Sequence, residues 1–107
     1  MIDEFGTESK DAPRPTTREK SVEAAVCAYA KKLGWLVYKF TSPGNAGVPD
    51  RLFLRAGVAL FVEFKAPGRK ARPEQRAQMA KIEAVGVRCY VIDSADKGRQ
   101  LFDAETL

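Results

Sequence analysis

The first hydrophobic pattern in the chain has the period of a helix. Apolar side chains follow Glu19 at intervals of three and four residues, as one buried helix face requires: Val22, Ala25, Val26, Tyr29, Ala30 and Leu33. Lys31 and Lys32 would lie in the last turn, where positive charge is favoured, and Gly34 would end the helix. The pattern therefore predicts a helix that begins near Glu19 and ends before Gly34.

Three strands are expected next. Residues 35–40 (WLVYKF) are rich in aromatic and β-branched side chains, whereas residues 41–49 (TSPGNAGVP) have the composition of a loop. Residues 51–55 (RLFLR) and 58–65 (VALFVEFK) flank an Ala-Gly pair, which predicts a β-hairpin. The second hairpin strand is apolar enough to be central in the sheet.

The remaining pattern predicts a helix, a strand and a helix. A basic loop at 66–72 precedes a helix from Pro73 to about Val85, which Gly86 would stop. A strand at 87–92 and a short helix at 95–102 follow. We expect Leu101 and Phe102 on that last helix to cover the sheet edge. The order α-β-β-β-α-β-α describes an α/β domain with a mixed central sheet between helices.

Residues 1–18 lack periodicity and contain two prolines, so we expect a flexible leader before a single domain at 19–107. The leader has three basic and four acidic side chains, while the domain has fifteen basic and ten acidic ones and hence a charge of +5. A basic domain attracts polyanions such as nucleic acid. Charge alone does not distinguish this from an ordinary solvated surface.

Composition excludes several kinds of chemistry. The chain has no histidine, which rules out Ser-His-Asp hydrolysis and histidine-based zinc sites. Cys27 and Cys89 are expected to be reduced, the first half-buried on a helix and the second in a core strand. There is no apolar run that could span a membrane and no signal peptide, so the expected location is the cytoplasm.

Glu63 and Lys65 are the first candidates for chemistry. Side chains alternate along a strand, so these two share one face while Val62 and Phe64 occupy the other. Burying charge is costly unless it is paired or binds a metal. A simple Glu63–Lys65 salt bridge at the sheet rim is the alternative explanation.

Asp50 strengthens the case for a metal. It lies at the open end of the hairpin, where strand pairing can bring it beside Glu63. Two facing carboxylates repel each other, and a divalent cation such as Mg²⁺ converts that repulsion into a binding site. Such a cation activates water and polarises a phosphate, and Lys65 can neutralise charge that develops on the phosphate. This is phosphodiester hydrolysis without histidine.

The string D-x12-E-x-K is weak by itself, but its surroundings are specific. The runs SPGNAGVPDR and FVEFKAPG, with Gln75 in the following helix and Glu23 in the first, closely resemble the VRR-NUC family of the PD-(D/E)XK nuclease superfamily. The resemblance extends from Glu19 to Phe102, with the motifs in the expected order.

The resemblance implies a role for each matching residue. Asp50 and Glu63 would bind the metal with the Phe64 carbonyl, Lys65 would be the catalytic lysine, and Gln75 would lie near metal or phosphate. Glu23 would contact metal through water, although Glu19, one turn earlier, is an alternative. The family also implies Mg²⁺ with Mn²⁺ as a substitute, branched, junction (Holliday junction) or flap DNA as the substrate, and a homodimer.

Several loop and basic residues are candidates for contact with DNA. The loop candidates are Ser42, Gly44, Asn45 and Gly47, and the cationic ones are Lys39, Arg51, Arg69, Lys70 and Arg72. The loop can equally be a tight connection, and a charge run is often only solvated. Most aromatic side chains are interpreted as core: Tyr29, Trp35, Tyr38, Phe40, Phe53, Phe61 and Tyr90. No GxxxxGK[S/T] motif is present, so no nucleotide cofactor is expected.

Two alternatives to an endonuclease remain. One is a catalytically silent nucleic-acid-binding module with the same fold, which the basic surface would suit. The other is an assembly subunit whose hairpin mediates dimerisation. Intact carboxylates argue against a pure binder, because negative charge opposes a phosphate backbone.

Overall fold

The computed structural model describes residues 17–107, which form the seven elements in the predicted order. They are α1 (Thr17–Lys32), β1 (Leu36–Lys39), β2 (Arg51–Arg55), β3 (Val58–Phe64), α2 (Pro73–Ala84), β4 (Arg88–Ile92) and α3 (Ala95–Thr106). Helix α1 begins two residues earlier than expected, at Thr17. The rest of the predicted leader, residues 1–16, lies outside the described residues.

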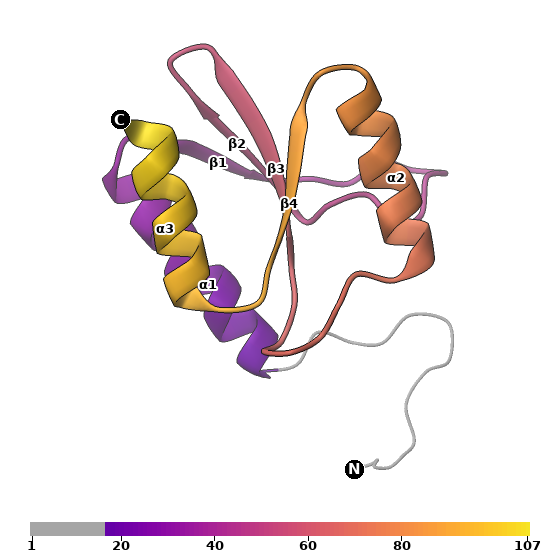
Figure 1. Cartoon of the computed structure of the whole chain (residues 1–107), viewed down its shortest axis with the longest axis horizontal. Coiled ribbons are helices and arrows are strands. Elements are labelled where there is room, and N and C mark those ends of the chain that lie inside the picture. The colour runs from indigo at the N-terminus through magenta and orange to yellow at the C-terminus, as the bar shows by residue number, and fades with distance from the viewer. Residues whose placement is uncertain (1–16) are drawn as a thin grey trace.

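The four strands form one mixed sheet in the order β1-β2-β3-β4. The first three strands are antiparallel, and β4 runs parallel to β3. Helices α1 and α3 cover one face of the sheet, and α2 lies on the other (Figure 1). The prediction of a central β3 in a three-layer α/β domain is therefore confirmed.

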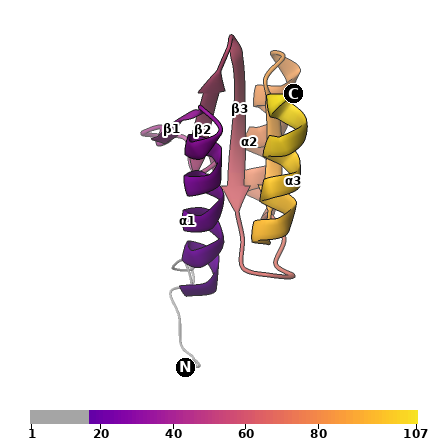
Figure 2. The ribbon, with the colours of Figure 1, turned by 90° about the vertical axis from the view of Figure 1, so that its left-hand side faces the viewer.

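The main core lies between the sheet and the α1–α3 layer. Val26 from α1 is fully buried there with the inward side chains of β2 and β3, including Phe53, Leu60 and Val62. Figure 2 shows α1 and α3 side by side over this face. Gly98 permits this approach, because a Cβ added there would come within 2.2 Å of a Val26 methyl group.

Helix α3 differs from its prediction in length and in placement. It continues to Thr106 instead of ending at residue 102. Phe102 does not cover the sheet edge: it is fully buried, and its ring contacts Trp35 and Phe53. Leu101 packs against the same core. The sequence pattern of Leu101 and Phe102 alone did not indicate that α3 lies across the sheet face beside α1.

The environments of the two cysteines are the reverse of those expected. Cys27 is buried in the core, whereas Cys89 is half-buried, and both are free thiols. Burial raises the pKa of Cys27, and burial followed by the charge of Glu83 raises the pKa of Cys89 to about 11. Both side chains are therefore protonated at neutral pH.

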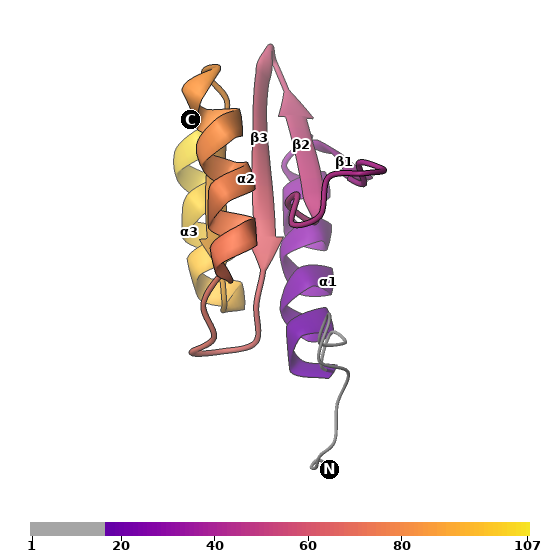
Figure 3. The same cartoon turned by 90° about the vertical axis from the view of Figure 1, so that its right-hand side faces the viewer.

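Half of the sheet has no helix over it on the α2 side. Figure 3 shows α2 on the side of β3 that is away from β2 and β1, so no helix covers β2 and β1 on this face. Leu36 and Tyr38 of β1 are 57% and 53% exposed on this face. The interpretation of Tyr38 as core is therefore wrong, since β1 is an edge strand without a covering layer. Within residues 17–107, no helix is long and apolar enough to cross a membrane.

Candidate active site

The predicted site residues come from segments that meet at one end of the sheet. The C-terminal end of β3 and the N-terminal end of α1 lie at this end (Figure 1). Asp50 directly precedes β2 and Glu63 lies at the end of β3, which Lys65 directly follows. Gln75 is in the first turn of α2. The fold therefore brings polar side chains from separate elements next to a well-packed core.

Asp50 is held at the hairpin opening by backbone contacts on both of its sides. Arg51 pairs with Val62, so the register places Asp50 opposite Glu63. Its carboxylate oxygen Oδ2 accepts a hydrogen bond of 2.8 Å from the backbone N–H of Phe64, and its carbonyl accepts one from the N–H of Phe40. Burial is the main cause that raises the pKa of Asp50, opposed by the Phe64 N–H.

Glu63 is an ionisable side chain that is almost completely buried in the candidate site, since the residue is only 3% exposed. One carboxylate oxygen, Oε2, accepts a hydrogen bond of 2.8 Å from Gln75 Nε2 and lies 3.6 Å from Lys65 Nζ. The other oxygen, Oε1, is buried and has no hydrogen-bond partner. Burial, followed by the negative charge of Asp50, raises the pKa of Glu63 to about 8. A buried, unpartnered carboxylate oxygen is costly and requires an explanation.

Gln75 links the start of α2 to this carboxylate. Its side-chain oxygen accepts 2.8 Å from the backbone N–H of Arg72, and its amide nitrogen donates to Glu63. Gln75 as a whole is 7% exposed, so both contacts are shielded from water. Gln75 therefore fixes the orientation of Glu63 and leaves Oε1 as its free oxygen.

The donor set fits a hard cation. Residues 17–107 contain no group of three or more Asp, Glu or Cys side chains placed to hold a metal by themselves. Mg²⁺ does not need such a cage, because it keeps several waters and binds through one or two carboxylates. Asp50 opposite the unpartnered Oε1 of Glu63 is such a pair.

Glu23 and Arg51 pair with each other. Arg51 Nε donates to Glu23 Oε2 at 2.6 Å, and both side chains are partly buried. Glu23 was predicted to contact metal through water and Arg51 to contact phosphate. In the structure each of these charges already has an intramolecular partner.

Glu19 is the acidic residue of α1 that interacts with both carboxylates of the pair. Burial and then Asp50 raise the pKa of Glu19, and Glu19 in turn raises that of Glu63. It lies one helical turn before Glu23, so the i, i+4 spacing was the signal in the sequence for this alternative.

The loop before Asp50 is a compact connection. Asn45 donates from its side chain and its backbone to Ser42, at 2.9 and 3.0 Å. Gly44 and Gly47 both have positive φ angles, and a Cβ on Gly47 would lie 2.8 Å from the carbonyl oxygen of Glu74. The need for glycine at position 47 is thus explained by packing against α2.

The three cationic side chains of the basic loop 66–72 differ in exposure. Arg69 and Lys70 are exposed, and the positive charge of Arg69 acts to lower the pKa of Glu19. Arg72 lies 3.2 Å from the carboxylate of Glu74 and is only partly exposed. Arg69 and Lys70 are therefore more available to a phosphate backbone than Arg72.

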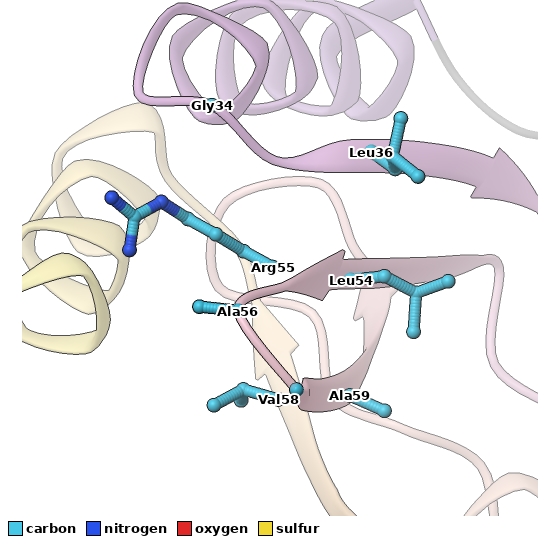
Figure 4. Close-up of a pocket in the computed structure, with 8 residues that line it drawn as sticks. Gly34, Leu36, Leu54, Arg55, Ala56, Val58 and Ala59 are labelled. Atoms are coloured by element: carbon cyan, nitrogen blue, oxygen red, sulfur yellow. The ribbon is translucent and has the colours of Figure 1, made fainter.

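A separate cavity of about 410 Å³ lies near the hairpin turn. Figure 4 shows Leu36, Leu54 and Ala59 along it, while Arg55 points away, where its Nε donates to the Leu33 carbonyl. Its lining contains no carboxylate, so it is a feature of the uncovered sheet face and not of the active site.

Two of the three comparisons with known proteins give matches, and these two agree. No family model matches the sequence. The chain is 46% identical over 80 residues to a protein named "Putative nuclease p44" from Acyrthosiphon pisum secondary endosymbiont phage 1. The aligned region covers 74% of this chain and 86% of that protein. A solved structure described as a VRR_NUC domain matches with a TM-score of 0.76 and 30% identity, over 82% of this chain and 97% of its own. With the PD and ExK residues assembled at one end of a matching mixed sheet, the chain belongs to the VRR-NUC family of nucleases in the PD-(D/E)XK superfamily.

Proposed function

We propose that the protein is a Mg²⁺-dependent endodeoxyribonuclease whose centre is formed by Asp50, Glu63 and Lys65. The observation that carries the proposal is the buried Oε1 of Glu63, which has no partner and belongs to a strand that also places Lys65 in the site. A carboxylate held in this state gains a favourable interaction when a cation binds. Membership of a nuclease family supports hydrolysis as the reaction.

Asp50 and Glu63 would hold the cation, with the Phe64 carbonyl as a further ligand and Mn²⁺ as a substitute for Mg²⁺. When bound, the cation supplies Lewis-acid activation of water and of the scissile phosphate. Asp50 is preorganised for this role by the Phe64 N–H, and Glu63 by the Gln75 amide. These contacts reduce the reorganisation that cation binding requires.

Lys65 contributes positive charge next to the carboxylates. Its side chain is 11% exposed and its ammonium lies 3.6 Å from Glu63. A shielded ammonium stabilises negative charge on a phosphate more strongly than a solvated one. Lys65 would therefore stabilise the charge that develops on the phosphate during cleavage.

We also propose that the substrate is branched DNA such as junctions or flaps, and that two copies act together where two strands are cut, as in a junction. One domain of this size has one centre, so cutting two strands needs a second copy. The uncovered sheet face supplies an apolar surface for it, with exposed Leu36 and Tyr38 beside the cavity near the hairpin turn. The similarity to a phage protein supports action inside an infected host cell, where the DNA substrate would be located.

The homodimer is tested by sedimentation of the parent and of Leu36→Ser/Tyr38→Ser. We expect a dimeric parent and a folded, monomeric variant. Lys31→Gln/Lys32→Gln, also on the surface, serves as the control and should stay dimeric. A parent that sediments as a monomer at micromolar concentration contradicts this part of the proposal.

The activity is tested with a panel of labelled linear, nicked, flapped and four-way DNA substrates, with Mg²⁺ and with chelator. We expect internal cleavage that requires Mg²⁺, ranks the branched substrates first and disappears in Asp50→Asn. Tight DNA binding without cleavage in Mg²⁺ or Mn²⁺ would instead favour a catalytically silent binding module. Undiminished cleavage by Asp50→Asn would show that the centre is assigned wrongly.

A further inference from the structure

A second concavity, of about 430 Å³, lies where the loop 66–72 meets the end of β4 and the start of α3. Its lining contains four cationic side chains and one carboxylate: Gly68, Arg69, Lys70, Ala71, Arg76, Val91, Asp93 and Lys97. Arg76 and Lys97 belong to different helices and are not part of the active site described above. A concentration of positive charge in a cavity favours an anionic ligand.

The single carboxylate in this cavity is already engaged. Asp93 Oδ2 accepts a hydrogen bond of 3.0 Å from the backbone N–H of Gly68, and Oδ1 accepts one of 2.9 Å from Lys97 Nζ. The Lys97 contact and then the Gly68 N–H lower the pKa of Asp93, so it stays ionised. Asp93 thus ties the basic loop to α3 and fixes two walls of the cavity, and the lining keeps a formal charge of +3.

The cations retain capacity to bind a ligand. Arg76 donates one hydrogen bond from NH1 to the Ala71 carbonyl at 2.7 Å, which leaves other guanidinium donors. Lys97 is 63% exposed, and Asp93 accepts only one of its three protons. Within residues 17–107, Arg69, Lys70 and Arg76 form no ion pair.

The position of the cavity relates it to the cutting centre. The loop that forms one wall of the cavity begins directly after Lys65. Arg69 in this loop is close enough to the candidate active site for its positive charge to act to lower the pKa of Glu19. A DNA backbone that crosses this loop would present one phosphate to Asp50 and Glu63 and another to the cavity. Phosphate contacts of this kind set the position of a nucleic acid without reading its sequence.

We propose that this cavity binds a backbone phosphate of DNA away from the cleaved phosphodiester, through Arg76 and Lys97 with Arg69 and Lys70 at its rim. The inference rests on the proposed nuclease function and adds the path of the flanking DNA. Arg76 and Lys97 were not found from the sequence, because they are twenty-one residues apart on two helices.

The test is DNA binding by Arg76→Gln/Lys97→Gln, measured by fluorescence anisotropy with a labelled duplex and a chelator, over a series of salt concentrations. Losing two phosphate contacts should weaken binding by about tenfold near 0.1 M salt and reduce the slope of log K against log salt by about 1 to 2. Lys31→Gln/Lys32→Gln, which removes equal charge from exposed positions at the far end of α1, should match the parent. Arg76→Lys/Lys97→Arg keeps both charges and should retain most of the affinity.

The outcomes separate this inference from the nuclease proposal. A parent that cleaves DNA while Arg76→Gln/Lys97→Gln binds with unchanged affinity and slope overturns the phosphate site and leaves the nuclease proposal standing. A parent that binds DNA through these residues but does not cleave it in Mg²⁺ or Mn²⁺ overturns the nuclease proposal alone. A parent that binds neither duplex nor branched DNA at low salt overturns both.

Discussion

Replacing Glu63 with glutamine should stabilise the metal-free protein at alkaline pH and abolish cleavage. Glu63 is 3% exposed, and its pKa is raised from 4.5 to about 8 by burial and by the charge of Asp50. Glutamine keeps the size and the acceptor for the Gln75 amide, but it introduces no charge. It therefore removes the cost of ionising a buried group together with a ligand for the cation.

The magnitude follows from proton linkage. Because the folded pKa is above the unfolded one, the folded protein binds the proton more tightly, so its stability falls as the pH rises from about 4.5 to about 8. One proton over this interval corresponds to at most about 5 kcal/mol, and loss of the Lys65 interaction in the variant reduces the difference. We expect the parent to lose about 2–4 kcal/mol of unfolding free energy across this window, a large share of the stability of a small domain.

The assay is urea unfolding of metal-free parent and Glu63→Gln at pH 5.5, 7 and 8.5 in the presence of chelator. Glu63→Gln should show a much flatter dependence on pH and exceed the parent in stability at pH 8.5. Asp50 and Glu19 also have raised pKa values, so a shallow fall in the same direction should remain. Equal slopes for the two proteins would refute the assignment of a buried, ionisable Glu63.

Three further substitutions test the surroundings of the site. Gln75→Ala leaves a buried Glu63 oxygen without its donor, so it should lower the unfolding free energy by about 2–3 kcal/mol in urea titrations and reduce the cleavage rate. Gly47→Ala should slow cleavage more than Gly44→Ala, because both have positive φ but only the Cβ at 47 meets α2 backbone, at 2.8 Å; equal rates would contradict the packing role of the loop. Gly98→Ala should lower the melting temperature through its clash with Val26, and Gly98→Ala/Val26→Ala should lose less than the sum of the two single changes.

The parts of the site that the sequence predicted depend on local geometry. Strand alternation separates Glu63 and Lys65 from Val62, and the hairpin register alone places Asp50 opposite Glu63. The order of all seven elements followed from apolar periodicity and from Pro and Gly positions. Each of these inferences uses residues that are close in the chain or directly paired.

The features that the sequence did not predict depend on packing between distant elements. The pairing of Glu23 with Arg51 joins residues 28 apart, and the Asp93 link between the basic loop and α3 has no signature in either segment. The burial of Phe102 required knowing that Gly98 lets α3 approach α1. Likewise, the exposure of Tyr38 follows from which strand lies at the sheet edge and which half α2 covers.

The central claim is that Asp50 and Glu63 together form a cation site on which cleavage depends. Calorimetric titration of metal-free protein with Mn²⁺ tests it most directly, using the parent, Asp50→Asn and Glu63→Gln, with Asp103→Asn as a control carboxylate on α3. We predict binding by the parent and the control, and no measurable binding by the two site variants. Parental Mn²⁺ affinity in Asp50→Asn or Glu63→Gln would contradict the account.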